Sequence, residues 1–348
     1  MLAAFAAPAL AQTKECTDEF KAATYQKWYD NRKEHQDVAA QAAKDYLATC
    51  TTEDQYSAAL KKFVVLWDQM NAHAAVNTQF EEAYKNKNYA EQLRLGKQII
   101  ATDPDNSAVY IIMGLAGLGD PNVLNESAQY AKKAIEMIEA GKPFKPYTTK
   151  DQPLAYLNWV VGKAALKSAP ADAIPYLLKA ARLESDLKKK PQLYLDLAAA
   201  YNDGPRAKLT EEYKSKVGPN QTETPESKLA LENLYQVLDR QIDAMARAAA
   251  LADPANKKAI MDELTELYKY RNKSETGLNE LVASVLSKPL PDVPTPLTSL
   301  PTTTPSSSAT PATGGAQTGT AANGTQTGSA KPVASPTPGN KPKSPRSH

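Results

Sequence analysis

The sequence predicts an all-α protein made of consecutive helix pairs and ending in an unfolded tail. From Gln12 to about Lys288, Ala, Leu, Lys and Glu dominate, and apolar residues recur at intervals of three and four. Breaks such as Asp103-Pro104 divide this pattern into short helices, because proline cannot continue a helix. At Pro289 the composition changes abruptly to Pro, Thr, Ser, Gly and Ala.

The composition argues against a nucleic-acid-binding protein. Charged residues make up 23% of the 348 residues, and the net charge is only +2. Aromatic residues make up 7%, mostly as Tyr, which suits thin helical layers better than a thick globular core.

Residues 1–11 are expected to be the remnant of an export signal peptide. The segment Leu2–Leu10 is short and apolar, and Ala9-Leu10-Ala11 fits the small-x-small cleavage pattern before Gln12. No Lys or Arg precedes Lys14, so we expect the true start to lie upstream. The segment is too short to span a membrane.

Residues 12–52 are expected to form a helical hairpin closed by a disulfide. Helices are predicted from about Asp18 to Glu34 and from about Asp37 to Ala48, which places Cys16 and Cys50 at the same end. An exported protein meets an oxidising compartment, so a disulfide is favoured over two separate buried thiols.

Residues 53–217 are expected to hold the repeated helix pairs. One pair spans about Asn77–Ala101, the next Ser107–Met137 and a third Leu154–Leu183, and a fourth starts at Gln192 with a weak second helix. Small residues at Gly114, Gly162 and Ala198 would let the paired helices approach closely. The strand-like run Phe63–Trp67 lies within a longer helical pattern and is interpreted as a buried helix face.

This pattern resembles the tetratricopeptide (TPR) repeat family, whose period is about 34 residues. The resemblance covers roughly Asn77 to Asp203 and implies a right-handed α-solenoid, a TPR-like superhelix. Gln92 and Ile99 depart from it, because the family prefers small residues there, and the connection Ala140–Gln152 is longer than the family's turn.

Residues 218–288 are expected to form capping helices. Thr224-Pro225-Glu226 starts a long helix with an apolar stripe that includes Leu231, Leu238 and Met245. The stripe either packs on the last repeat as a cap or forms an exposed dimerisation seam. Further helices are predicted over Lys257–Tyr270 and Ser274–Leu286.

Residues 289–348 are expected to be a disordered Pro/Thr/Ser/Gly-rich tail, because they cannot bury enough apolar surface to offset the entropy lost on ordering. The tail either has no specific role or serves as a spacer through an envelope layer, as a glycosylated segment, or as a contact with the envelope or cell wall through its basic end.

The sequence offers no catalytic, cofactor-binding or metal-binding motif. The three histidines, His35, His73 and His348, lack a second histidine at metal-ligand spacing. We therefore expect no enzyme and no cofactor.

The resemblance instead implies a concave groove that binds a partner peptide or protein. Tyr156 and Trp159 would supply apolar anchors beside two lysines, although Trp159 could equally be core between repeats. The family's inward-facing positions fall here on Asn77, Glu81, Tyr84, Lys85, Ile111, Leu115, Tyr156, Trp159, Lys163, Lys167, Gln192, Leu195 and Asn202.

These observations predict an exported, non-enzymatic interaction scaffold of the cell envelope, in the periplasm or associated with the envelope. The alternatives are a structural envelope-assembly or wall-associated subunit and, third, the helical accessory domain of a wall-degrading enzyme.

Overall fold

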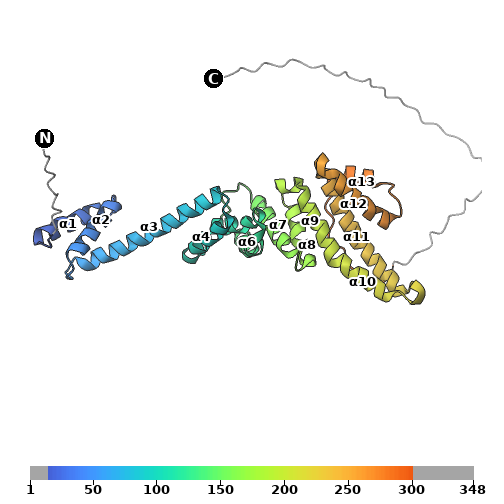
Figure 1. Cartoon of the computed structure of the whole chain (residues 1–348), viewed down its shortest axis with the longest axis horizontal. Helices are drawn as coiled ribbons and strands as arrows, with labels where there is room; N and C mark the ends of the chain where they lie inside the picture. The colour runs from blue at the N-terminus through green and yellow to red at the C-terminus, as the bar shows by residue number, and fades with distance from the viewer. Residues whose placement is uncertain (1–14, 301–348) are drawn as a thin grey trace, which may run out of the picture. The chain divides into compact units, whose positions relative to one another are not determined.

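The fold of residues 15–300 is all-helical, with no β-strand in that range, in a computed structural model of the chain (Figure 1). The predicted signal peptide remnant and residues 301–348 of the predicted tail lie outside the described residues.

The helices follow the predicted pairs closely. They are α1 (Asp18–Asn31), α2 (Gln36–Thr49), α3 (Ser57–Lys85), α4 (Tyr89–Thr102), α5 (Ser107–Leu115), α6 (Leu124–Glu139), α7 (Asp151–Ala165), α8 (Pro170–Arg182), α9 (Pro191–Tyr201), α10 (Ala207–Lys216), α11 (Pro225–Leu251), α12 (Pro254–Asn272) and α13 (Leu278–Ser284). From α1 to α9, each helix packs on the next one in the chain. The core accordingly divides into clusters that follow chain order. A right-handed solenoid path stays a prediction.

The N-terminal hairpin is closed as predicted. Cys16 and Cys50 form a disulfide, with their Cα atoms 5.1 Å apart. The Thr17 hydroxyl accepts a hydrogen bond from the Phe20 amide and caps the start of α1, which fixes the chain direction directly after Cys16. The disulfide and the cap therefore act on the same turn.

Helix α3 corrects one expectation, because its apolar run is helical but not buried. Val65 and Leu66 are each about half exposed, and Met70 is 59% exposed. The start of α3 packs on α2, the end packs on α4, and every residue from 68 to 75 is exposed. Helical periodicity alone could not show that the two packed ends use different parts of the helix and leave its middle uncovered.

Small residues set the helix spacing in the middle of the chain, as predicted. A Cβ atom on Gly114 would lie 2.8 Å from the Cα of Ala131 in α6, and one on Gly162 would lie 2.6 Å from the side chain of Leu177 in α8. Gln92, which departs from the TPR pattern, is buried and donates a hydrogen bond to the carbonyl of Ala83 at the end of α3. Its amide thereby ties α4 to α3.

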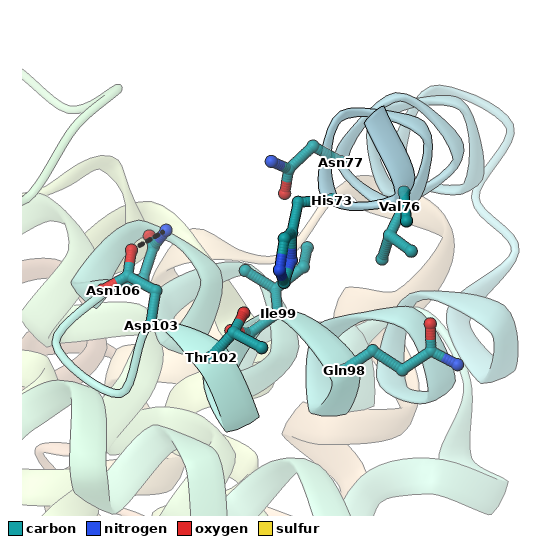
Figure 2. Close-up of a pocket in the computed structure, with 9 residues that line it drawn as sticks. His73, Val76, Asn77, Gln98, Ile99, Thr102, Asp103 and Asn106 are labelled. Atoms are coloured by element: carbon teal, nitrogen blue, oxygen red, sulfur yellow. Dashed lines mark hydrogen bonds between the residues drawn. The ribbon is translucent and has the colours of Figure 1, made fainter. Parts of the chain in front are cut away.

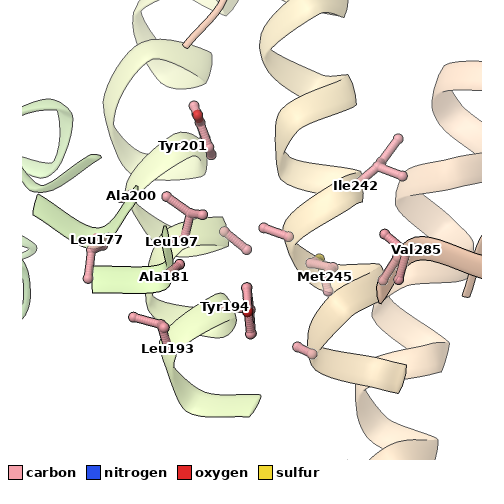
Figure 3. Packing of buried hydrophobic residues seen from close by; sticks show 14 of the residues in the cluster. Leu177, Ala181, Leu193, Tyr194, Leu197, Ala200, Tyr201, Ile242, Met245 and Val285 are labelled. Atoms are coloured by element: carbon pink, nitrogen blue, oxygen red, sulfur yellow. The ribbon is translucent and has the colours of Figure 1, made fainter. Parts of the chain in front are cut away.

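The long helix α11 packs on α9, α10 and α12, and its apolar stripe is buried from Leu234 onward, with Leu231 partly buried, rather than left as an exposed seam. Figure 3 shows Ile242 and Met245 of α11 facing Tyr194, Leu197 and Tyr201 of α9. The start of α11 has the predicted cap: the Thr224 hydroxyl accepts from the Ser227 amide, and the Ser227 hydroxyl accepts from the Thr224 amide.

Residues 289–300, predicted as the start of the tail, are held against the helices. Residues 288–300 leave η6 (Val285–Ser287) and contact side chains of α11, and we call this segment the strap. The prediction of disorder from Pro289 is therefore wrong for 289–300. Within 15–300, no helix combines the length and apolar character needed to cross a membrane.

Removing the disulfide should destabilise the N-terminal hairpin. The bond closes a loop of 34 residues, so Cys16→Ser with Cys50→Ser should cost ~3–4 kcal/mol in the free energy of local unfolding. Amide hydrogen exchange in α1 and α2 measures this loss. Reductant should reproduce it in the wild type and have no effect on the double variant; equal protection in both proteins would contradict the assignment.

The hairpin should also lose stability in acid. Asp54 accepts hydrogen bonds from the Tyr46 hydroxyl at 2.6 Å and from Ser57, and the Tyr46 bond is the main reason that the pKa of Asp54 falls to about 2. A lowered folded-state pKa stabilises the fold above the unfolded pKa of about 3.9. The stability should be lost as the pH falls from about 4 to about 2.

Amide exchange in α1 and α2 across this pH range tests the expectation. Asp54→Asn should lower protection at neutral pH and flatten the acid dependence, whereas Glu34→Gln, which changes an exposed carboxylate between α1 and α2, serves as the matched control.

Candidate functional site

The predicted groove residues fall into separate groups on the structure. Trp159 and Lys163 on α7 meet Gln192 on α9 around one buried carboxylate. Asn77, Glu81, Tyr84 and Lys85 are exposed near the end of α3, on the part of its surface that α4 does not cover.

Asp196 of α9 is the centre of the first group, which we call the Asp196 cluster. Its side chain is 7% exposed and accepts from the Trp159 indole N–H at 2.7 Å and from the Gln192 amide at 2.8 Å. The Lys163 ammonium lies 3.4 Å from the same carboxylate and 5.2 Å from the centre of the Trp159 ring. A buried carboxylate needs such partners, so the cluster links side chains of α7 to α9.

Trp159 therefore has a structural role that its sequence position did not distinguish from a groove role. Its N–H is already satisfied by Asp196, while its ring remains partly exposed beside Tyr156, with 6.3 Å between ring centroids. The indole N–H of Trp159 links α7 to α9 through Asp196, and the indole ring forms part of the exposed surface.

Two further tyrosine hydroxyls extend this surface. The Tyr156 hydroxyl donates to Asp186 at 3.0 Å, and burial, with this bond and the nearby Asp186 charge, raises the pKa of Tyr156 to about 12. Burial also raises the pKa of Tyr147, with smaller contributions from Tyr84 and Asp186. Both hydroxyls are protonated at neutral pH, as ordinary tyrosines are, and the Tyr156 proton is already donated to Asp186.

A hollow of about 330 Å³ adjoins the Asp196 cluster. Three of the predicted residues, Gln192, Leu195 and Asn202, line it. The Asn202 amide oxygen accepts from Arg206 at 2.6 Å and from Gln241 of α11 at 3.4 Å, so the wall of the hollow is tied to the capping helix.

A second hollow, of about 490 Å³, lies between α3 and α4 (Figure 2). His73 points from α3 toward Ile99 and Thr102 of α4, and Asn77 lies beside it. Of the predicted residues only Asn77 lines this hollow, and Glu81 is 4.0 Å from Lys85 in an exposed ion pair.

Two predicted groove residues belong to the core instead. Ile111 is completely buried in the cluster between α5, α6 and α7, and Leu115 is partly buried against it. Ile111 is therefore unavailable to a ligand. Lys167, in contrast, is exposed just beyond α7.

Sequence reasoning missed Asp186, Asp196 and Gln241. The spacing of Gln192 and Asp196, four residues apart on a predicted helix, could have indicated a shared contact. The need of a half-buried indole N–H for an acceptor was a second available signal. Among residues 15–300, no group of three or more His, Cys, Asp or Glu side chains is placed to hold a metal ion.

The arrangement offers aromatic rings, satisfied hydrogen-bond donors and one exposed lysine, which are elements of a binding surface. No protein-family model matches this chain, and a search of the curated proteins found no similar protein.

Proposed function

We propose that the protein is a non-enzymatic, TPR-like scaffold that binds a partner peptide or protein on the surface formed by Tyr156, Trp159, Gln192 and Leu195. The observation that carries the proposal is the Asp196 cluster, whose hydrogen bonds hold Trp159 in place before any ligand arrives. Preorganised aromatic side chains bind with little loss of conformational entropy.

The charge of the surface indicates the partner's chemistry. Lys163 is already paired with Asp196, whereas Lys167 is exposed and makes no ion pair among the described residues. Together with the apolar rings, this lysine favours a segment that carries an apolar anchor and an acidic residue.

We also propose that the protein works in the cell envelope after export. The Cys16–Cys50 disulfide supports this location, because structural disulfides persist in oxidising compartments.

Photo-crosslinking from position 167 in native envelopes tests the surface. A crosslinkable phenylalanine there should capture one protein partner, and Tyr156→Ala on the same chain should lower the yield at least about tenfold, as expected for the loss of an aromatic anchor. The matched control is a crosslinker at Lys132, which is exposed on α6 beside a different hollow.

Circular dichroism and thermal melting must show that Tyr156→Ala keeps its helices. Equal capture from positions 167 and 132, or capture that Tyr156→Ala does not change, would remove this surface as the binding site.

A second candidate function, assembly of several copies into an envelope structure, is favoured by the exposed Val65, Leu66 and Met70 of α3. We take a second copy of the chain as the partner of this face, because an apolar patch repeated on two identical chains can cover itself in a two-fold contact.

Light scattering after size-exclusion chromatography measures the assembly. The wild type should have twice the monomer mass, and Leu66→Lys with Met70→Glu should have the monomer mass. Lys208→Glu on α10, which changes an exposed charge away from α3, should leave the dimer intact. A monomeric wild type at concentrations of about 100 μM would contradict this candidate.

A further inference from the structure

Three side chains of α11 contact the strap at seven-residue intervals. Arg247 donates to the carbonyls of Lys288 and Pro289, both at 3.0 Å. Arg240 donates to the carbonyl of Asp292 at 2.6 Å. Asn233 makes two bonds to Leu297: its amide nitrogen donates to the carbonyl at 3.1 Å, and its amide oxygen accepts from the N–H at 2.6 Å. We call these three side chains the α11 ladder.

The spacing of the ladder fits an extended chain that runs antiparallel to α11. Seven residues of an α-helix rise about 10.5 Å. Between the Lys288–Pro289 carbonyls and the Asp292 carbonyl there are three to four residues, which span about 11 Å in a polyproline conformation. The next step, to Leu297, is five residues long and leaves slack in the segment.

The chemistry of the ladder suits a proline-rich chain. A proline offers a carbonyl acceptor but no N–H, and an arginine offers only donors. Arg247 and Arg240 bind backbone carbonyls only, and a proline supplies a carbonyl as well as any other residue does. The third contact is different, because Asn233 uses both the N–H and the carbonyl of Leu297, so a proline at that position would lose one bond. The ladder thus requires a residue other than proline at one defined position.

Side chains of the strap add selectivity. The carboxylate of Asp292, the only acidic residue from 289 to 348, accepts from Arg182 of α8 at 2.6 Å. Leu290 packs against the large apolar cluster that includes residues of α9 and α11. The α11 ladder and Arg182 therefore recognise an apolar residue, an acid two residues later and a non-proline residue five positions beyond that.

We propose that the α11 ladder, with Arg182, is a second peptide-binding site, separate from the Asp196 cluster, and that it takes extended proline-rich segments with one acidic residue. Its resident ligand is the chain's own strap, residues 288–300. Most of its bonds go to the backbone, so the same segment offered from outside can occupy the site once the resident strap is displaced. Covalent attachment gives the strap an effective concentration in the millimolar range, which keeps external segments out of the wild-type site.

The test uses the full-length chain with the strap released by Asp292→Arg and Leu297→Pro. Asp292→Arg places a positive charge beside Arg182 and Arg240. Leu297→Pro removes the backbone N–H that donates a hydrogen bond to the Asn233 amide oxygen. A fluorescent peptide with the sequence of residues 286–300 is then titrated and its anisotropy measured. It should bind the released chain at least about tenfold more tightly than it binds the wild type.

Two controls distinguish binding at the α11 ladder from nonspecific binding of the peptide. The same peptide with its aspartate replaced by lysine and its second-last leucine (position 297) replaced by proline should lose binding. Adding Asn233→Ala and Arg240→Gln to the released chain should abolish binding of the native peptide. Equal binding of the native and control peptides to a released chain that keeps its helicity would overturn the proposal.

A second measurement needs no released variant. In the wild-type chain, the Leu297 amide should be protected from hydrogen exchange, and Asn233→Ala should increase its exchange rate at least about tenfold. An unprotected Leu297 amide in the wild type would equally overturn the proposal. Neither measurement involves Tyr156 or Trp159, so its result is independent of the binding surface proposed around the Asp196 cluster.

Discussion

Burial of the apolar face of α11 is the interaction on which the C-terminal half of the structure depends. A helix pair cannot bury both of its faces by itself, so a stack of pairs needs a final element that covers the last one. α11 covers α9 with Ile242 and Met245 and also contacts α10, α12 and α13. With its apolar face fixed in this way, the remaining surface of α11 is free to carry the polar side chains that hold the strap.

The Asp196 cluster shows how an electrostatic requirement can shape a binding surface. A carboxylate loses hydration when it is buried, and it is stable only when donors replace the water. Here the donors come from Trp159, Lys163 and Gln192 on two helices. The hydrogen bond that Trp159 donates to Asp196 therefore also fixes the orientation of the indole ring. One interaction thus stabilises the buried carboxylate and sets the shape of the surface.

Local sequence signals predicted most of the helices, the cap at Thr224 and the Cys16–Cys50 disulfide, because each depends on residues close in the chain or on a short hairpin. The misjudged features depend on distant contacts. The exposure of Leu66 could not be foreseen, since periodicity gives a helix but not its neighbours. Likewise, composition indicated disorder from Pro289. The side chains that hold the strap lie on α11, 41 to 64 residues earlier in the chain, and composition contains no information about such distant contacts.

The uncovered middle of α3 has a consequence for folding cooperativity. Residues 68–75 are all exposed, so they are kept helical by their own backbone hydrogen bonds and by the packed turns at either end of α3. Short helices without tertiary packing are marginal in water. Loss of this one stretch would leave the disulfide-closed hairpin and the helices from α4 onward with separate cores, and each could unfold at its own free energy. A single melting temperature would then be an average over two transitions rather than a property of one folded unit.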